Sequence, residues 1–313
     1  MVSNFLDKEQ VPLVSIVMCT CNGEKFVSKQ LDSILQQTYS NIEIIISDDA
    51  STNETLQILH EYASLDQRIK LTVNEINLGF TKNFSKACLL ATGNYIAFCD
   101  QDDIWHPEKI EKMLNNWTSG VPMMYVNSVR FNDESEIPFL KENKRYRRFE
   151  GTDTRKIAVF NTISGHALMV NRAFLIKILP FQEGLMYDWW TAAVASCSGG
   201  VAYLNEILVY QRVHSGNISV GKGFSHLELA YKKDFMQMVN NHLLAFSLIP
   251  QLKSADKIFF NRFQQVWQKG MNKKFSLSLF LFLFRYRKIV FWYKKRKFAW
   301  FSHIKHSFKL SLN

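Results

Sequence analysis

Three carboxylates stand close together in the stretch FCDQDDIW, residues 98–105. Asp100, Asp102 and Asp103 follow an apolar run and precede a tryptophan. A single aspartate at this place could cap a helix. Three like charges repel one another unless a cation neutralises them, and hard oxygen ligands suit Mg²⁺ or Mn²⁺. The cluster therefore favours a divalent metal site that bridges substrate phosphates.

Such a site needs a scaffold, and the first hundred residues alternate between strand and helix periodicity. Ser51 and Glu54 match a capping box for the second helix. The alternation predicts an α/β fold with a mostly parallel sheet and helices on both faces. The expected strands are 13–19, 42–47, 69–73 and 94–99, and the expected helices are 25–37, one after 51 and one near 81–91.

Polar residues follow three of these strands. In an open α/β sheet, ligands bind beyond the carboxyl ends of the strands. We therefore expect three loops to converge on one edge. These loops carry Thr20, Asn22 and Glu24 after the first strand, Asp48 and Asp49 after the second, and the DQDD cluster after the fourth.

Two common nucleotide-binding motifs are missing from the sequence. No GxGxxG follows the first strand, and no GxxxxGK[ST] occurs anywhere. These absences count against a dinucleotide-binding Rossmann domain and against a P-loop. The remaining common use of carboxylates at such strand ends is to hold a nucleotide diphosphate through a metal.

The pattern changes after Pro107, which is well placed in the first turn of a helix. Residues 127–156 are polar and mixed in charge, so we expect a long surface excursion. Structure should resume at 163–170 (ISGHALMV), in a helix around 187–195 and in a strand at 207–213. From about residue 224 the sequence is helical and increasingly aromatic.

The composition is that of a globular protein. The chain has 313 residues, 47% of them hydrophobic, which is enough for a large core. Its five cysteines imply no disulfide framework, and Cys19 and Cys21 lack a second ligand pair for zinc. The first ten residues contain no apolar segment, so we expect no secretory signal and a cytoplasmic protein.

The charge is concentrated at the C-terminal end. Residues 257–313 hold 14 Lys and Arg and no Asp or Glu, which leaves 24 basic and 28 acidic residues for 1–256. The apolar run 275–284 is too short to span a bilayer. Aromatic and basic residues follow it, a composition that predicts an interfacial helix on an anionic membrane surface. An ordinary helical subdomain with a basic face is the alternative, and the aliphatic neighbours of the aromatics disfavour nucleic acid.

A set of ordered motifs resembles a known family. VSIVMCTCNGE, IISDDAS, NLGF followed by FCDQDDIW, YDWW and RVHSGN occur in this order between residues 11 and 222. Together they are similar to a family 2 glycosyltransferase of the GT-A fold. The nearest subgroup is that of the bacterial rhamnosyltransferases that build surface polysaccharide.

The resemblance implies a role for each matching position. Cys21 departs from the aromatic residue that many members have there, so stacking on the base is not expected. Trp105 is either a wall of the donor pocket or part of the core. The implied roles are the nucleotide pocket for Thr20, Asn22 and Glu24, base or ribose for Asp48, ribose or sugar for Asp100, metal for Asp102, metal or diphosphate for His214, and catalytic base for Asp188.

Physical chemistry supports the role of Asp188. A sugar hydroxyl is a poor nucleophile, so a carboxylate must take its proton as it attacks. Trp189 and Trp190 supply apolar surroundings, which raise the proton affinity of a carboxylate. Alternatively, Asp188 caps the helix that contains these tryptophans. The alternative for His214 is a purely structural role. A metal would neutralise the leaving nucleoside diphosphate.

The sequence as a whole predicts an inverting, metal-dependent glycosyltransferase on the inner face of the membrane. The resemblance implies dTDP-L-rhamnose or a UDP-sugar as the donor and a lipid-linked or growing glycan as the acceptor. We expect a GT-A domain over 1–222, with a nucleotide half (11–105) and an acceptor half (106–222), and a helical basic region over 223–313. The alternatives are a sugar nucleotidyltransferase, which should carry a glycine-rich loop in place of TCNGEK, and a non-catalytic membrane adaptor. The roles of Asp103 (metal ligand or helix cap) and of Lys82 and Asn83 (phosphate contact or solvated helix start) stay open.

Overall fold

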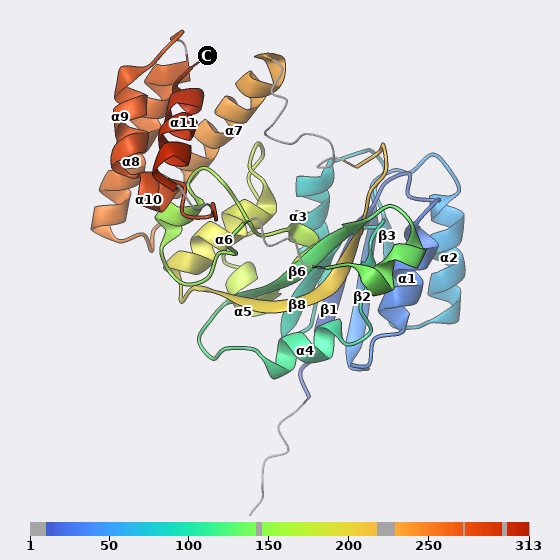
Figure 1. The fold of residues 1–313 in the computed structure, drawn as a ribbon. Coiled ribbons are helices and arrows are strands. Elements are labelled where there is room, and N and C mark those ends of the chain that lie inside the picture. The colour runs from blue at the N-terminus through green and yellow to red at the C-terminus, as the bar shows by residue number, and fades with distance from the viewer. Residues whose placement is uncertain (1–10, 142–145, 218–228, 272, 296–298, 313) are drawn as a thin grey trace, which may run out of the picture.

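The computed structural model describes residues 11–141, 146–217, 229–271, 273–295 and 299–312 (Figure 1). Within them the strands form one mixed sheet in the order β3-β2-β1-β4-β7-β6-β8-β5. The strands are β1 (Val14–Thr20), β2 (Ile42–Asp48), β3 (Ile69–Val73), β4 (Tyr95–Cys99), β5 (Ile104–Trp105), β6 (Met123–Phe131), β7 (Leu168–Asn171) and β8 (Val201–Arg212).

The helices fall into two groups along the chain. Those before residue 200 alternate with the strands, and those after it follow one another directly. They are α1 (Val27–Leu35), α2 (Thr55–Leu65), α3 (Phe80–Leu90), α4 (Lys109–Asn115), α5 (Arg172–Leu175), α6 (Tyr187–Cys197), α7 (Leu229–Ser247), α8 (Ser254–Met271), α9 (Leu277–Arg285), α10 (Arg287–Val290) and α11 (Ala299–Ser311), with short 3₁₀ turns η1 (Glu134–Phe139), η2 (Thr154–Ile157) and η3 (Gly165–Ala167).

The N-terminal half of the sheet is parallel, as the sequence predicts. β3, β2, β1 and β4 pair in parallel, so their carboxyl ends share one edge. β7 then pairs antiparallel with both β4 and β6, β8 runs parallel to β6, and β5 closes the order antiparallel to β8. The predicted mixed, mostly parallel sheet of an α/β fold is confirmed.

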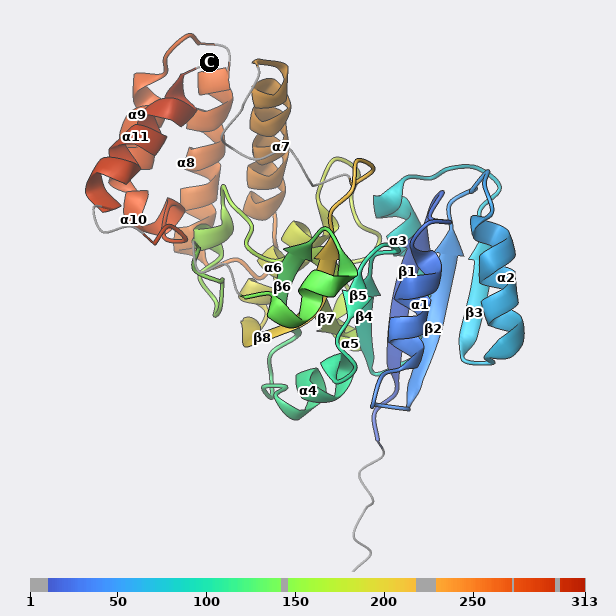
Figure 2. The ribbon, with the colours of Figure 1, turned by 45° about the vertical axis from the view of Figure 1, so that its right-hand side comes forward.

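Alternating side chains of β1 show why helices cover both faces. Ile16 and Met18 pack with the buried faces of α1, α2 and α4, whereas Val17 packs with α3 and the helices that follow β6. Strand side chains point to opposite faces in turn, so a continuous apolar run requires cover on both sides. Figure 2 shows α1 and α2 in front of the parallel strands.

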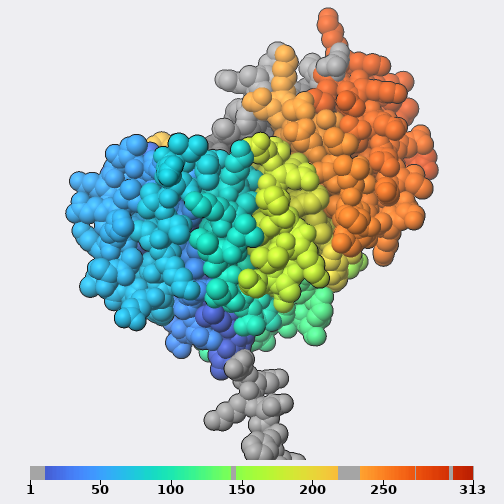
Figure 3. Space-filling view, turned by 180° about the vertical axis from the view of Figure 1, so that it is seen from behind, coloured from blue at the N-terminus to red at the C-terminus, as the bar shows by residue number. Residues whose placement is uncertain are grey.

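The C-terminal helices pack on the body of the protein. Their apolar residues belong to the same core as α3 and α6, and Tyr187 of α6 contacts Phe84 of α3. Figure 3 shows the yellow-green segment, which includes α5 and α6, between the blue-green segment of α3 and the orange C-terminal helices. Trp189 of α6 stacks on His242 of α7 with ring centroids 4.3 Å apart, and Trp292 Nε1 donates to the Lys156 carbonyl at 2.5 Å. The region predicted over 223–313 therefore shares the core of the acceptor half.

One prediction about the middle of the chain is wrong. Residues 127–131, expected in a surface excursion, belong to β6 inside the sheet, and Phe149 is fully buried. The predicted segments 163–170, 187–195 and 207–213 correspond to η3 with β7, to α6 and to β8. In the described parts of the chain, none of the helices combines the length and apolarity that crossing a membrane requires.

Candidate active site

The carboxyl ends of β1 and β2 bring the first predicted residues together. Thr20 and Asp48 are register partners, and Thr20 Oγ1 donates to Asp48 Oδ1 at 2.8 Å. Asp48 is fully buried and also accepts from the Ser51 hydroxyl and backbone N–H, at 2.6 and 2.8 Å. Its carboxylate therefore organises the loop after β2, and direct contact with a base or ribose stays a prediction.

Asn22 and Glu24 tie the loop after β1 to the loop after β2. Asn22 has a positive φ of 50°, a conformation that asparagine tolerates better than most residues, and its Oδ1 accepts from the Thr52 N–H at 2.9 Å. Glu24 Oε2 accepts from the Glu54 N–H at 3.1 Å. The structure thus gathers the predicted nucleotide-pocket residues on one edge of the sheet.

The predicted metal residues Asp102 and His214 are in direct contact. His214 Nε2 lies 2.7 Å from Asp102 Oδ2, and the Asn217 amide donates to the same oxygen at 3.0 Å. Burial and the nearby Asp100 raise the pKa of Asp102, and His214 partly offsets this. The Asn217 Oδ1 accepts from the His214 N–H at 2.6 Å, so the amide orients the two groups, and the carboxylate and the imidazole are the ligand types that fit a divalent cation such as Mn²⁺.

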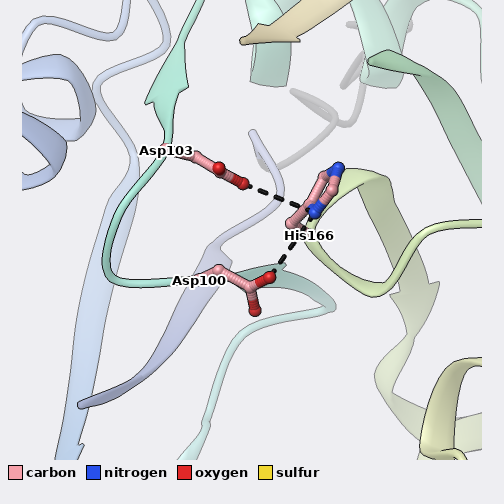
Figure 4. Close-up of side chains that lie close together, drawn as sticks. All are labelled: Asp100, Asp103 and His166. Atoms are coloured by element: carbon pink, nitrogen blue, oxygen red, sulfur yellow. Dashed lines mark ion pairs between the residues drawn. The ribbon is translucent and has the colours of Figure 1, made fainter. Parts of the chain in front are cut away.

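Asp100, Asp103 and His166 form a second group (Figure 4), and the charges of Asp100 and His166 act on Asp102 of the first group. His166 Nδ1 is 3.4 Å from an oxygen of each carboxylate, and the three potential ligand atoms lie within 4.8 Å of one another. Burial lowers the pKa of His166, but Asp103 and Asp100 outweigh it, so the pKa ends above its ordinary value. Asp103 Oδ2 is buried without a hydrogen-bond partner, which also fits a cation nearby.

Sequence reasoning missed His166 and left the role of Asp103 open. Helix α4 begins at Lys109 without a side-chain cap, so Asp103 is not its cap. Instead Asp103 Oδ1 accepts from the Arg212 N–H at 3.2 Å. The one signal for His166 was an imidazole in the otherwise apolar segment ISGHALMV.

A buried lysine lies beneath these carboxylates. Lys109 Nζ donates to the His166 carbonyl at 3.0 Å and lies 3.2 Å from the ring centroid of Trp105. Burial lowers the pKa of Lys109 to about 7. Trp105 is 1% exposed and belongs to the apolar core, which is the second of the two roles that the sequence allowed.

Asp188 lies in the first turn of α6. Its Oδ1 accepts from the Trp189 N–H at 2.7 Å, but the N-cap of α6 is Met186, so Asp188 is not the capping residue. Burial raises the pKa of Asp188 to about 7; the Trp189 N–H opposes this shift and the charge of Asp100 adds to it. The structure therefore places Asp188 within electrostatic range of the DQDD cluster.

The two open positions at the start of α3 make contacts within the protein. Asn83 is 1% exposed, donates to the Ser47 carbonyl and accepts from the Ser47 hydroxyl. Lys82 forms an ion pair with Glu183. For Asn83 the structure therefore shows neither a phosphate contact nor a solvated helix start but a buried link between α3 and β2.

Comparison with known proteins agrees with this class of α/β fold. The model of the family "Glycosyl transferase family 2" matches residues 15–179, more than half of the chain. The fold is similar to that of S. aureus TarS in complex with UDP-GlcNAc, with a TM-score of 0.63 and 19% identity over 88% of this chain and 81% of that one. It is also similar to the mannosyltransferase PcManGT of Pyrobaculum calidifontis in complex with GDP-Man and Mn²⁺, with a TM-score of 0.57 and 14% identity over 97% of this chain and 86% of that one.

The chain thus has a GT-A-like fold and belongs to glycosyl transferase family 2. A sequence relative is the Escherichia coli UDP-Glc:alpha-D-GlcNAc-diphosphoundecaprenol beta-1,3-glucosyltransferase WfgD, 37% identical over 126 residues. That match covers 40% of this chain and 49% of WfgD. Matches to three other curated relatives cover 33%, 66% and 41% of their lengths.

Proposed function

We propose that this protein transfers a sugar from a nucleotide donor to a glycan hydroxyl with inversion at the anomeric carbon. The observation that carries the proposal is Asp188. It is a carboxylate with a pKa raised to about 7, near the carboxylates that follow β4. A group with this pKa is ionised in part at neutral pH and binds a proton readily, which suits a general base.

The residues of the site have separate roles in the proposed reaction. The loops after β1 and β2 hold the nucleotide, and Asp100 orients the sugar. The oxygen of the acceptor hydroxyl forms a bond to C1 of the sugar, and the bond from C1 to the diphosphate oxygen breaks. Asp188 accepts the proton of the hydroxyl in the same step. A single displacement of this kind inverts the configuration at C1.

Asp102 and His214 would hold the divalent cation, and the Asn217 amide orients the Asp102 carboxylate. Mg²⁺ or Mn²⁺ neutralises charge on the departing diphosphate when it is bound. In the structure the Asp102 carboxylate accepts hydrogen bonds from its two neighbours, which hold it in one orientation. The Mn²⁺ in the PcManGT complex supports this assignment for the fold.

For the donor we propose dTDP-L-rhamnose, as the resemblance implies, with a UDP-sugar as the alternative. For the acceptor we propose a lipid-linked or growing surface polysaccharide, which places the reaction at the cytoplasmic face of the membrane. The name of WfgD, a glucosyltransferase that acts on a diphosphoundecaprenol-linked sugar, supports this class of acceptor.

The test is a panel of nucleotide sugars with Mg²⁺ or Mn²⁺ and GlcNAc-diphosphoundecaprenol, scored for nucleoside diphosphate release and sugar transfer. Asp188→Asn should lower kcat by about 10²- to 10⁴-fold, the usual effect of removing a general base. Glu61→Gln, an exposed carboxylate of α2, is the matched control. Unchanged turnover of Asp188→Asn, or a product with retained anomeric configuration, would contradict the mechanism.

A further inference from the structure

An apolar patch lies on the outer face of α9 and α11. Within the described residues, six large apolar side chains on these two helices and just before them are between 39% and 67% exposed. A group of exposed apolar side chains of this kind on a protein surface marks an interaction site. Its members are Phe275, Leu277, Leu281, Trp300, Phe301 and Phe308, and we call them the α9/α11 patch.

Contacts between the two helices join the part of the patch before α9 to the part near the end of α11. The ring centroids of Phe275 and Phe308 are 5.6 Å apart, and the Ser276 N–H donates to the Ser311 carbonyl at 2.9 Å. The start of α9 therefore lies against the end of α11. Leu277 and Leu281 lie one helical turn apart on α9, and the rings of Trp300 and Phe301, 4.9 Å apart, lie about two turns before Phe308 on α11.

Basic residues belong to the same segment as the patch. Each of the following side chains is exposed, and residues 257–313 contain no Asp or Glu. The surface therefore combines exposed apolar and basic side chains, with Lys305 between Phe301 and Phe308 on one face of α11, and its own segment contributes no acidic side chain. The basic residues are Lys273 and Lys274 before α9, Arg285 at its end, Lys288 on α10, and Lys305 and Lys309 on α11.

We propose that the α9/α11 patch binds directly to an anionic lipid bilayer. Apolar and aromatic side chains gain by entering the boundary between headgroups and acyl chains, and lysines and arginines gain from anionic headgroups. A second copy of this chain fits poorly, because its equally basic patch would bring like charges together. Figure 1 shows the bundle of α7 to α11 rising beyond the sheet on the side where β1 and β2 end. Membrane contact on this side would bring a lipid-linked acceptor near the site.

The structure also shows which variants can test the proposal. Deleting the segment would uncover Phe259 and Phe263 of α8, which pack against Phe282 of α9. Surface substitutions avoid this damage. Phe301→Ser with Phe308→Ser removes apolar area, and Lys273→Glu with Lys274→Glu reverses charge. Leu65→Ser and Lys177→Glu are exposed controls outside the patch.

The experiment is co-sedimentation of the full chain with vesicles of phosphatidylcholine, with and without phosphatidylglycerol. The wild type and both controls should bind the anionic vesicles, and high salt should weaken binding. The charge variant should lose at least about fivefold in partition coefficient for each lysine replaced, since ~1 kcal/mol per basic residue corresponds to about fivefold. We expect a loss of the same size for each phenylalanine replaced in the other variant. Circular dichroism should show unchanged folding.

Two outcomes would overturn the proposal. One is equal binding of wild type and both patch variants to anionic vesicles. The other is a wild-type dimer in light scattering, together with a monomer for the Phe301→Ser, Phe308→Ser variant and unchanged vesicle binding. That result would make the patch an interface between copies of the chain. Because nucleoside diphosphate release is measured separately, failure of the membrane proposal leaves the test of the transferase proposal intact, and the reverse holds too.

Discussion

Gln101 pairs with the backbone of Cys21 through both ends of its side-chain amide. Its Oε1 accepts from the Cys21 N–H at 2.9 Å, and its Nε2 donates to the Cys21 carbonyl at 3.1 Å. The loop after β1, which carries Asn22, is thereby fixed to the acidic loop that carries Asp102. The glutamine of the DQDD cluster thus has a positioning role between the nucleotide loop and the predicted metal residues.

We expect Gln101→Ala to raise the KM for the donor about tenfold with a smaller change in kcat, because two hydrogen bonds of ~1 kcal/mol each then no longer hold the loop. Gly23 provides an independent check, since a Cβ there would overlap the Gln101 amide. Gly23→Ala should therefore raise the donor KM as well. In the double variant the shortened side chain at position 101 leaves room for the alanine at position 23. The rise in donor KM should therefore not exceed that of Gln101→Ala alone. Additive losses would contradict this role, and Gln57→Ala on α2 is the control.

The pH dependence of the reaction should follow Asp188. The base must be deprotonated, and its pKa is raised to about 7. We therefore expect kcat/KM to fall about tenfold per pH unit well below 7 and to level off above it. An acidic limb centred near pH 4 would show that a carboxylate of ordinary pKa is responsible.

His166 offers a directed test of the same pKa. Its positive charge lowers the pKa of Asp188, while Asp100 raises it. Replacing His166 by Asn removes the positive charge, so the midpoint of the acidic limb should move to higher pH. A purely structural loss would lower activity at every pH without moving the midpoint, and a shift to lower pH would contradict the assignment.

The metal site can be located by comparing the two neighbouring groups. If Asp102 and His214 hold the cation, Asp102→Asn should weaken Mn²⁺ binding by at least about tenfold, because carboxylate ligands supply the main attraction for a hard cation. His166→Asn should weaken it less. Mn²⁺ binding is measured by electron paramagnetic resonance without substrate, and Glu61→Gln is the control. The reverse order of effects would assign the cation to Asp100, Asp103 and His166.

Sequence periodicity was sufficient for the parallel strands and for the convergence of their loops. Thr20 and Asp48 follow apolar runs whose length and spacing identify β1 and β2, and a parallel sheet brings such ends together. The role of Ser51 was not predictable in this way. It was expected to form a capping box with Glu54, but its hydroxyl donates to Asp48, and α2 begins at Thr55 without a side-chain cap. A side chain that could cap a helix can instead bond to another residue, and the local capping pattern does not contain that contact.

His166 and Lys109 show the same limit for the site. Lys109 follows Pro107 at a helix start, a place that is usually solvated, yet it is fully buried because β5 and η3 close over it. His166 meets Asp100 and Asp103 only through the pairing of β7 with β4. Both contacts depend on the antiparallel half of the sheet, whose strands follow the weakly patterned middle of the sequence.

The stability of the parallel sheet should depend on Glu43, a buried carboxylate at the start of β2. It accepts from Lys70 Nζ at 2.6 Å, from the Ser15 hydroxyl at 2.6 Å and from the Thr92 N–H and hydroxyl at 2.7 and 2.8 Å, and so links the starts of β1, β2 and β3 to the turn before β4. Burial alone would raise the pKa of Glu43, but these hydrogen bonds outweigh it and lower the pKa to about 2 from the ordinary 4.5.

A folded-state pKa below the unfolded value means that Glu43 contributes its full stability above about pH 4.5 and loses it as the pH falls towards 2. We expect Glu43→Gln to lower the free energy of unfolding at pH 7 by ~2 kcal/mol, because the neutral amide cannot accept as many hydrogen bonds and leaves Lys70 unpaired. Urea unfolding of both proteins at pH 7 and pH 3 measures this. The difference should shrink at pH 3 as the wild-type advantage is lost, whereas Glu61→Gln, exposed on α2, should unfold like the wild type at both values. A difference between Glu43→Gln and wild type that is equal at both pH values would show that packing, and not the charge of Glu43, holds these strands.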